Sequence, residues 1–243
     1  MKILCVIPSR IASTRLPRKP LLNIQGKPMI QWVYENASRC KVLTKIVVAT
    51  DSMEIADVIT AIGGNVEMTD PNFQTGSDRA AAVALKYPEM DVVINLQGDE
   101  PFIRPNMLEQ LVAPYLAGET PEMTTLAYPL DRKTKFTDPG AVKVITDLQG
   151  NAMYFSRSPI PYFRTESPAP VYQHIGLYAF RRDFLLHYTT LKQTPLELTE
   201  SLEQLRALEN GYKIRVCLTE NKTLEINTLE EYAAAQEFEY EME

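Results

Sequence analysis

The chain has 243 residues, a formal net charge of −6 at pH 7 and a pI of about 5.2. This acidic balance argues against a general nucleic-acid binder, and no apolar run reaches the roughly 18 residues of a membrane span. The length allows one α/β domain with a large core or two small domains.

The cysteines and the first residues indicate a cytoplasmic protein. Cys5, Cys40 and Cys217 are isolated, odd in number and without metal-binding spacing, so we expect reduced thiols. The first residues lack the basic, apolar and small-residue segments of a secretory signal.

The first half of the chain alternates strand-like and helix-like segments, which predicts a doubly wound, mostly parallel sheet. The run at 92–96 is nearly all apolar, as in the buried middle of a parallel sheet. We predict strands over 3–7, 45–49, 66–68 and 92–96, and helices over 29–39, 53–62, 77–85 and 106–116.

The second half has shorter strands and a proline-rich segment over 158–170, which we expect to be a long shaped loop or arm. The chain is expected to form a single domain over 1–243, with an inserted strand and arm sub-region at about 120–180. We predict strands over 123–128, 142–146, 152–155, 175–180 and 213–218, and helices over 182–188, 198–209 and 229–240.

A loop rich in positive charge follows the first strand directly. Ligands of open α/β sheets bind beyond the carboxyl ends of the strands. Arginine forks and a lysine point charge would suit a polyphosphate there, although the loop could also be a solvated basic surface. Its cations are Arg10, Arg15, Arg18 and Lys19.

An aspartate stands at the end of the apolar strand over 92–96. Asp99 follows Gly98, which permits close approach of another group, and precedes Glu100-Pro101. Mg²⁺ in proteins is usually held by one or two carboxylates together with substrate phosphates. Asp99 is therefore a candidate magnesium ligand, the alternative being an ordinary turn residue.

The segment from Gln74 to Arg79 is a second candidate for ligand binding. Gly76 and Ser77 open a helix whose free N–H groups can hold an anion or a polar base edge. A cation in the first turn is disfavoured by the helix dipole, so Arg79 is expected to have a partner. Pairing with Asp78 or another neighbouring carboxylate is the structural alternative.

Two later motifs carry further polar side chains. Arg157 stands ahead of a proline-rich loop and could bind a carboxylate bidentately, with His174 and Tyr178 adding polar contacts. A histidine beside a strand is also often a satisfied structural residue. In the helix predicted over 198–209, leucines at helical spacing form a core face, and we expect the side chains off that face to be solvated. Those side chains are Glu203, Gln204 and Arg206.

Taken together, the motifs resemble one family, the 3-deoxy-manno-octulosonate (Kdo) cytidylyltransferases, nearly end to end. The first two alone would indicate only a sugar nucleotidyltransferase, and the last three single out the Kdo enzymes. The motifs are Ser-Arg-x-x-Ser-Thr-Arg-Leu-Pro-x-Lys-Pro-Leu at 9–21, Leu-Gln-Gly-Asp-Glu-Pro at 96–101, Tyr-Phe-Ser-Arg-Ser-Pro-Ile-Pro at 154–161, His-Ile-Gly-Leu-Tyr at 174–178 and Leu-Glu-Gln-Leu-Arg at 202–206.

The resemblance implies a nucleotide-diphospho-sugar transferase-like fold and the conversion of CTP and Kdo to CMP-Kdo and pyrophosphate, for lipopolysaccharide synthesis. It also implies a need for Mg²⁺ and a homodimer joined through the inserted sub-region. No nucleic-acid partner or membrane span is expected.

The resemblance further implies a role for particular residues. Asp99, Arg15 and Lys19 would carry the reaction, with Asp99 as a metal ligand. CTP would be bound by Arg10, Ser13, Arg15, Lys19, Gln74, Ser77 and Arg79. The sugar would be bound by Arg157, His174, Tyr178, Glu203 and Gln204.

The chain departs from the family before its last helix. Where the family has Gly-Val-Asp-Thr, with the aspartate as a second metal ligand, this chain has Glu225-Ile226-Asn227-Thr228. Residues two apart in an extended segment face the same side, so Glu225 could restore the charge that Asn227 lacks. Alternatively, Glu225 could meet the ammonium group of 8-amino-Kdo, which a branch of the family activates, or be merely exposed. Arg18 also stands where glycine is common.

Two other functions stay open on these residues. The chain could be a cytidylyltransferase for another acidic sugar, such as a sialic-acid-like acid. It could also be a non-catalytic nucleotide-sugar binding protein, a hypothesis that depends on Asn227 standing in place of a metal-binding aspartate.

Overall fold

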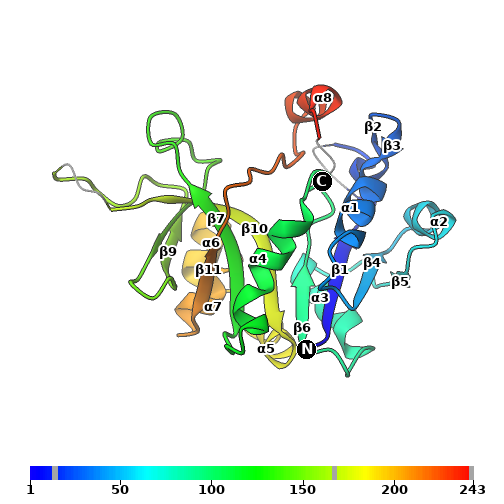
Figure 1. Cartoon of the computed structure of the whole chain (residues 1–243), viewed down its shortest axis with the longest axis horizontal. Coiled ribbons are helices and arrows are strands. Elements are labelled where there is room, and N and C mark those ends of the chain that lie inside the picture. The colour runs from blue at the N-terminus through cyan, green and yellow to red at the C-terminus, as the bar shows by residue number, and fades with distance from the viewer. Residues whose placement is uncertain (13–15, 166–168, 241–243) are drawn as a thin grey trace. The chain divides into compact units, whose positions relative to one another are not determined.

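The computed structural model describes residues 1–12, 16–165 and 169–240 (Figure 1). Its contacts divide the chain into two compact units. The first unit comprises Met1–Glu109 and Thr223–Glu243, and the second comprises Gln110–Lys222.

The first unit is built on parallel strands, which confirms the predicted α/β class. The strands lie side by side in the order β6, β1, β4, β5, and each adjacent pair is parallel (Figure 1). Their bounds are β1 Ile3–Ser9, β4 Lys45–Thr50, β5 Val66–Met68 and β6 Val92–Asn95.

The order of these strands creates a switch point. The chain moves outward from β1 to β4 and β5 and then returns to β6 on the other side of β1. In such sheets the crevice beyond the carboxyl ends at the reversal is the usual ligand site. Ser9 and Asn95 end the two strands concerned.

The helices of the first unit agree closely with the predicted ones, and two capping boxes fix their starts. Thr75 pairs with Asp78, and Thr228 pairs with Glu231. The helices are α1 Met29–Ser38, α2 Met53–Ala61, α3 Gly76–Leu85, α4 Pro105–Leu116, which continues into the second unit, and α8 Leu229–Glu237.

Three short elements were not predicted, because they are too short to show periodicity. They are the 3₁₀ turn η1 Lys19–Leu21 and the two-residue strands β2 Asn23–Ile24 and β3 Lys27–Pro28. The hairpin of β2 and β3 packs with α8 in a hydrophobic cluster that includes Trp32, Phe102 and Ile226. This cluster anchors the chain that leads into α8.

The second unit is a mixed sheet. β7 Met123–Pro129 is antiparallel to β10 Tyr172–Arg181 and parallel to β11 Ile214–Leu218. β8 Lys143–Thr146 pairs with both β10 and β9 Ala152–Ser156. The β7–β10 register shifts between Ile175 and Tyr178, which marks a bulge in β10.

The prediction of one helix over 198–209 is wrong. The structure has α6 Pro195–Glu200 and α7 Leu205–Glu209, separated by a turn in which Ser201 is left-handed with φ of 52°. Pro195 at the first helical position and the hydrogen bond from the Thr194 N–H to Glu197 start α6, and the left-handed Ser201 ends it. The second unit also contains α5 Arg182–Tyr188, as predicted.

The prediction that Gln204 and Arg206 are solvated is also wrong, and the turn between α6 and α7 is the reason. Gln204 and Arg206 are only 2% and 4% exposed. Arg206 forms a buried ion pair with Glu197, at 2.5 Å between Nη2 and Oε1, and its guanidinium lies over the ring of Tyr188. The break in the helix therefore turns this motif inward.

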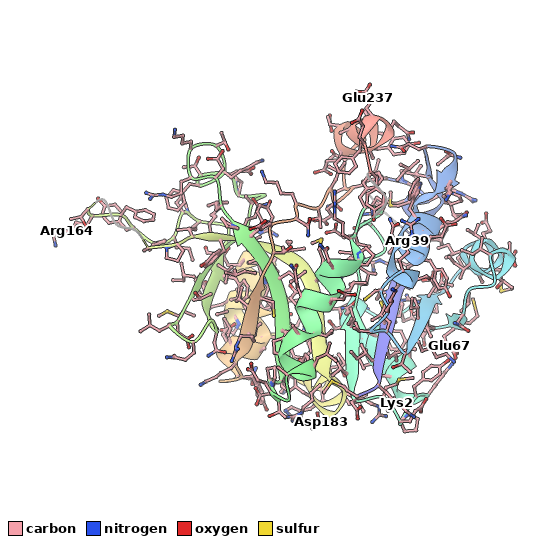
Figure 2. The ribbon with its side chains drawn as sticks, in the orientation of Figure 1. Lys2, Arg39, Glu67, Arg164, Asp183 and Glu237 are labelled. Carbon is pink, nitrogen blue, oxygen red and sulfur yellow. The ribbon has the colours of Figure 1, made fainter. Side chains whose placement is uncertain are left out.

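The segment between β9 and β10 fits the predicted arm. Its described residues form no helix or strand, and Figure 2 shows Arg164 extending away from the strands of this unit. None of the helices within the described residues is long and apolar enough to cross a membrane.

Arg18 is held in the left-handed region, with φ of 56°. This explains physically why a glycine suits the position, because only glycine adopts that conformation without steric cost. The guanidinium of Arg18 forms an exposed ion pair with Glu54 in α2. One of the four cations of the first loop is therefore neutralised by a carboxylate of α2.

We predict that Arg18→Gly is more stable than Arg18→Ala by about 1 kcal/mol, because only glycine relieves the left-handed strain. Both variants lose the exposed ion pair, which contributes about 0.2–1 kcal/mol. Urea unfolding of the two variants measures the difference. An alanine variant as stable as the glycine variant would contradict the assigned strain.

Candidate functional site

A cavity of about 560 Å³ lies in the first unit at the carboxyl ends of β1 and β6, the predicted crevice. Its volume is typical of a small-molecule site. Gly98 lies against the end of β1, where an added Cβ would be 3.0 Å from the carbonyl oxygen of Pro8. Predicted site residues on its wall are Arg10, Lys19, Gln74, Arg79, Asp99 and Asn227.

Lys19 is the centre of a polar network on this wall. Its Nζ lies 2.6 Å from Oδ2 of Asp99, 2.9 Å from the carbonyl oxygen of Ile226 and 3.0 Å from Oδ1 of Asn227. The ammonium group thus joins three segments that are far apart in the sequence. It also balances the charge of Asp99 directly.

Carboxylates gather around this network. Glu225 accepts a hydrogen bond of 2.5 Å from Nδ2 of Asn227, which turns the Oδ1 of that amide toward Lys19. Glu225 is exposed as a whole residue, but desolvation of its carboxyl beside this network and the charge of Asp99 raise its pKa. Burial, followed by the charge of Glu225, raises the pKa of Glu100 well above its ordinary value. The surplus of acidic groups favours a bound cation.

The few oxygen ligands on this wall suit Mg²⁺, which does not need a complete set of protein ligands. Within the described ranges, no group of three or more His, Cys, Asp or Glu side chains is arranged to hold a metal. Mg²⁺ needs only one or two carboxylates, because substrate phosphates and water complete its shell. Asp99 and the amide oxygen of Asn227 on the cavity wall meet that need. Glu225 reaches the site through Asn227.

The other end of the cavity is formed at the start of α3. Arg79 is 2% exposed and forms an ion pair of 3.2 Å with Asp51, at the end of β4. It also donates to Oγ1 of Thr69, and its guanidinium lies near the ring of Phe73. The partner expected for Arg79 is therefore Asp51, since Asp78 is used in the capping box.

Buried polar atoms beside this cavity lack partners. Oγ of Ser9 and Oδ1 of Asn95 are buried, and neither has a hydrogen-bond partner among the described residues. Ser77 lies under the wall, where its Oγ accepts from Nδ2 of Asn95 at 3.2 Å. Such orphaned groups are rare in native proteins and mark places where a ligand or water binds.

Ser13 and Arg15, which the resemblance places in the CTP site, lie outside the described residues.

The residues expected to bind the sugar lie in the second unit, where three of them form a cluster. The hydroxyl of Tyr178 donates to Oε1 of Gln204 at 3.0 Å, and the ring centroids of His174 and Tyr178 are 5.6 Å apart. Burial lowers the pKa of His174 to about 3. The imidazole is therefore neutral at physiological pH.

The guanidinium of Arg157 is bound to backbone carbonyl oxygens rather than to a carboxylate. Its Nε donates to the carbonyl oxygen of Glu200 at 2.8 Å, and its Nη1 donates to that of Pro139 at 3.1 Å.

The buried ammonium group of Lys143 lies 2.6 Å from the carbonyl oxygen of Arg157. The nearby Glu203 accepts at its carbonyl oxygen from the hydroxyl of Tyr188.

Sequence reasoning missed several residues that shape these groups. Phe73 lines the cavity without any distinguishing pattern. Lys143 and Thr125 are fully buried. Gln97, which also lines the cavity, belongs to the motif at 96–101, and Asp51 is a carboxylate just after a predicted strand, so these two residues had a usable signal.

Comparison with known proteins agrees with this geometry. A family model described as Cytidylyltransferase matches residues 4–214. The chain is 56% identical to a 3-deoxy-manno-octulosonate cytidylyltransferase of Acaryochloris marina, over 98% of this chain and 97% of that protein. It is 49% identical to the protein of that name from Synechococcus elongatus (strain ATCC 33912 / PCC 7942 / FACHB-805), over 97% of each chain.

A solved structure also matches. It is described as CMP:2-keto-3-deoxy-manno-octonic acid synthetase complexed with CTP, with a TM-score of 0.91, 40% sequence identity, and coverage of 98% of this chain and 100% of that one. A cytidylyltransferase from Leptospira borgpetersenii, 19% identical with a TM-score of 0.65 over 97% of this chain and 85% of that one, shows the same fold.

The fold and the cavity, together with the family match, define a nucleotidyltransferase of the cytidylyltransferase family. Within that family, the chain belongs to the 3-deoxy-manno-octulosonate cytidylyltransferases.

Proposed function

We propose that this protein transfers the cytidylyl group of CTP to Kdo, giving CMP-Kdo and pyrophosphate for lipopolysaccharide synthesis. The observation that carries the proposal is the Lys19–Asp99–Asn227 network on the wall of a cavity at the β1–β6 switch point. Relatives named for this reaction, at 56% and 49% identity over nearly the whole chain, support it.

In this reaction a sugar hydroxyl attacks the α-phosphorus of CTP while pyrophosphate leaves. Little covalent chemistry falls to the protein, so positioning and charge stabilisation contribute most of the rate. Arg10 and Lys19 supply positive charge at the cavity wall for the triphosphate. Arg15 remains a predicted third cation.

The nucleoside end is assigned to the start of α3. Gln74 and Arg79 line the cavity there, and Arg79 is fixed by Asp51. Ser77 does not line the cavity itself, and we expect it to act by accepting the hydrogen bond from Asn95. The unpartnered Oγ of Ser9 offers a further polar contact.

Mg²⁺ is proposed as the metal, held by Asp99 and Asn227 with Glu225 behind them. When bound, the ion would neutralise phosphate charge and make the attacking hydroxyl more acidic. Lys19 donates to both Asp99 and Asn227, which brings these two oxygens together on the cavity wall.

For the sugar we propose His174, Tyr178, Glu203, Gln204 and Arg157, all in the second unit. A single domain with a dimerising sub-region, a homodimer and a cytoplasmic location stay predictions, as does the choice between Kdo and 8-amino-Kdo.

The reaction is tested by a substrate panel read by released pyrophosphate. We expect release with CTP and Kdo or 8-amino-Kdo, and little with UTP, ATP or N-acetylneuraminate. Turnover with N-acetylneuraminate alone would identify an enzyme for another acidic sugar. CTP binding with no release under any pairing would identify a nucleotide-sugar binding protein and contradict the proposal.

A second prediction concerns the charge near Asn227. Glu225→Gln removes the negative charge that orients the amide, so we expect the Mg²⁺ concentration for half-maximal activity to rise at least about tenfold, as for other residues behind a metal ligand. Glu237→Gln, at the end of α8 (Figure 2), makes the same charge change and serves as the control.

The same variants separate the two interpretations of Glu225. If the Mg²⁺ requirement is unchanged while 8-amino-Kdo loses its preference over Kdo, the carboxylate meets the sugar's ammonium group, and its proposed support of the metal is wrong. If neither property changes, both interpretations are wrong.

A further inference from the structure

Thr125 is a fully buried residue of β7 whose hydroxyl has three neighbours. Its Oγ1 lies 2.9 Å from Nε2 of His174, 2.9 Å from the carbonyl oxygen of Leu177 and 3.3 Å from that of Ile175. The bulge in β10 between Ile175 and Tyr178 brings these groups to one hydroxyl.

The proton count of this hydroxyl settles the direction of its hydrogen bonds. A threonine hydroxyl has one proton and two lone pairs, and a carbonyl oxygen can only accept. If the hydroxyl donated to His174, neither carbonyl oxygen would receive its proton, at a cost in stability. The proton of Thr125 therefore goes to a carbonyl oxygen, with Leu177 the nearer, and the imidazole must donate from Nε2.

The imidazole then has no second proton to give. Its ring lies against the rings of Phe155 and Tyr178, and burial lowers its pKa to about 3. A neutral imidazole protonated at Nε2 leaves Nδ1 as a bare acceptor. Within the part of the chain that the structure describes, no hydrogen-bond partner of Nδ1 is seen.

A donor with no partner belongs to the same cluster. Gln204 is 2% exposed and accepts from Tyr178 through Oε1, while its Nε2 has no hydrogen-bond partner among the described residues. The cluster thus combines an unused acceptor with an unused donor and carries no positive charge of its own. A neutral hydroxyl, which both donates and accepts, matches that pair better than a carboxylate.

We propose that Thr125 is a positioning residue: by accepting the Nε2 proton of His174, it makes Nδ1 the acceptor for a hydroxyl group of the sugar. The proposal rests on the proposed function for the identity of the sugar. It assigns His174 and Gln204 to the hydroxyl-bearing part of the substrate and leaves the sugar carboxylate to other groups.

The first test uses the unmodified protein without substrate. In ¹⁵N-histidine-labelled protein, two-bond ¹⁵N–¹H correlation spectra distinguish a protonated from a bare ring nitrogen. The chain has only two histidines, and His187 serves as the internal control, since its Nε2 pairs with the exposed Tyr212 hydroxyl. We expect His174 to carry its proton on Nε2 alone from pH 5 to 8. A proton on Nδ1, or an imidazolium in that range, would overturn the proposal.

The second test uses Thr125→Val, which keeps the shape and removes the hydroxyl, and Thr125→Ser, which keeps the hydroxyl. We expect the valine variant to lose the single tautomer and to raise the KM for Kdo about tenfold, the size of one lost hydrogen bond. Its KM for CTP should change less than twofold, and the serine variant should restore both properties.

The results separate the proposal from the function on which it rests. A valine variant with an unchanged tautomer and an unchanged KM for the sugar would show that Thr125 does not position His174. If the panel identifies another acidic sugar, the tautomer measurement still decides the role of Thr125, and KM is measured with that sugar. If the valine variant fails to fold, the tautomer of the unmodified protein and the serine variant decide.

Discussion

The contacts of one ammonium group organise the cavity wall of the first unit. Lys19 reaches Asp99, Asn227 and the carbonyl oxygen of Ile226, and the N–H of Ile226 in turn donates to the carbonyl oxygen of Asp99 at 3.1 Å. These contacts join the first loop, the end of β6 and the chain before α8. An ammonium group and carboxylates in partial burial stabilise each other only while paired, so the same contacts hold both the charge and the geometry.

The topology of the sheet explains why this network lies on the wall of a cavity. The chain reverses beside β1, so the loops after β1 and β6 diverge and leave a cavity between their ends. Gly98 allows one loop to approach the other closely. The hydrophobic cluster under α8 then fixes Ile226, which brings the neighbouring Asn227 to the wall.

Long periodic elements of this chain were predictable, because burial on one face leaves a repeating pattern in the sequence. The strands β1, β4, β5 and β6 agree with prediction. The break at Ser201 was not predictable, since it depends on a left-handed residue and a buried ion pair rather than on a pattern. The same holds for the pairing of Asp51 with Arg79 and of Thr125 with His174, because these partners are distant in the sequence.

The account depends most on the carboxylate of Asp99, and Asp99→Asn tests it directly because the amide keeps the shape and removes the charge. Turnover at saturating CTP, Kdo and Mg²⁺ should fall at least about a thousandfold, a barrier increase of about 4 kcal/mol. CTP affinity measured without Mg²⁺ should change less than tenfold, since Lys19 and Arg10 remain on the wall. Turnover within tenfold of the unmodified protein would contradict the central place given to Asp99.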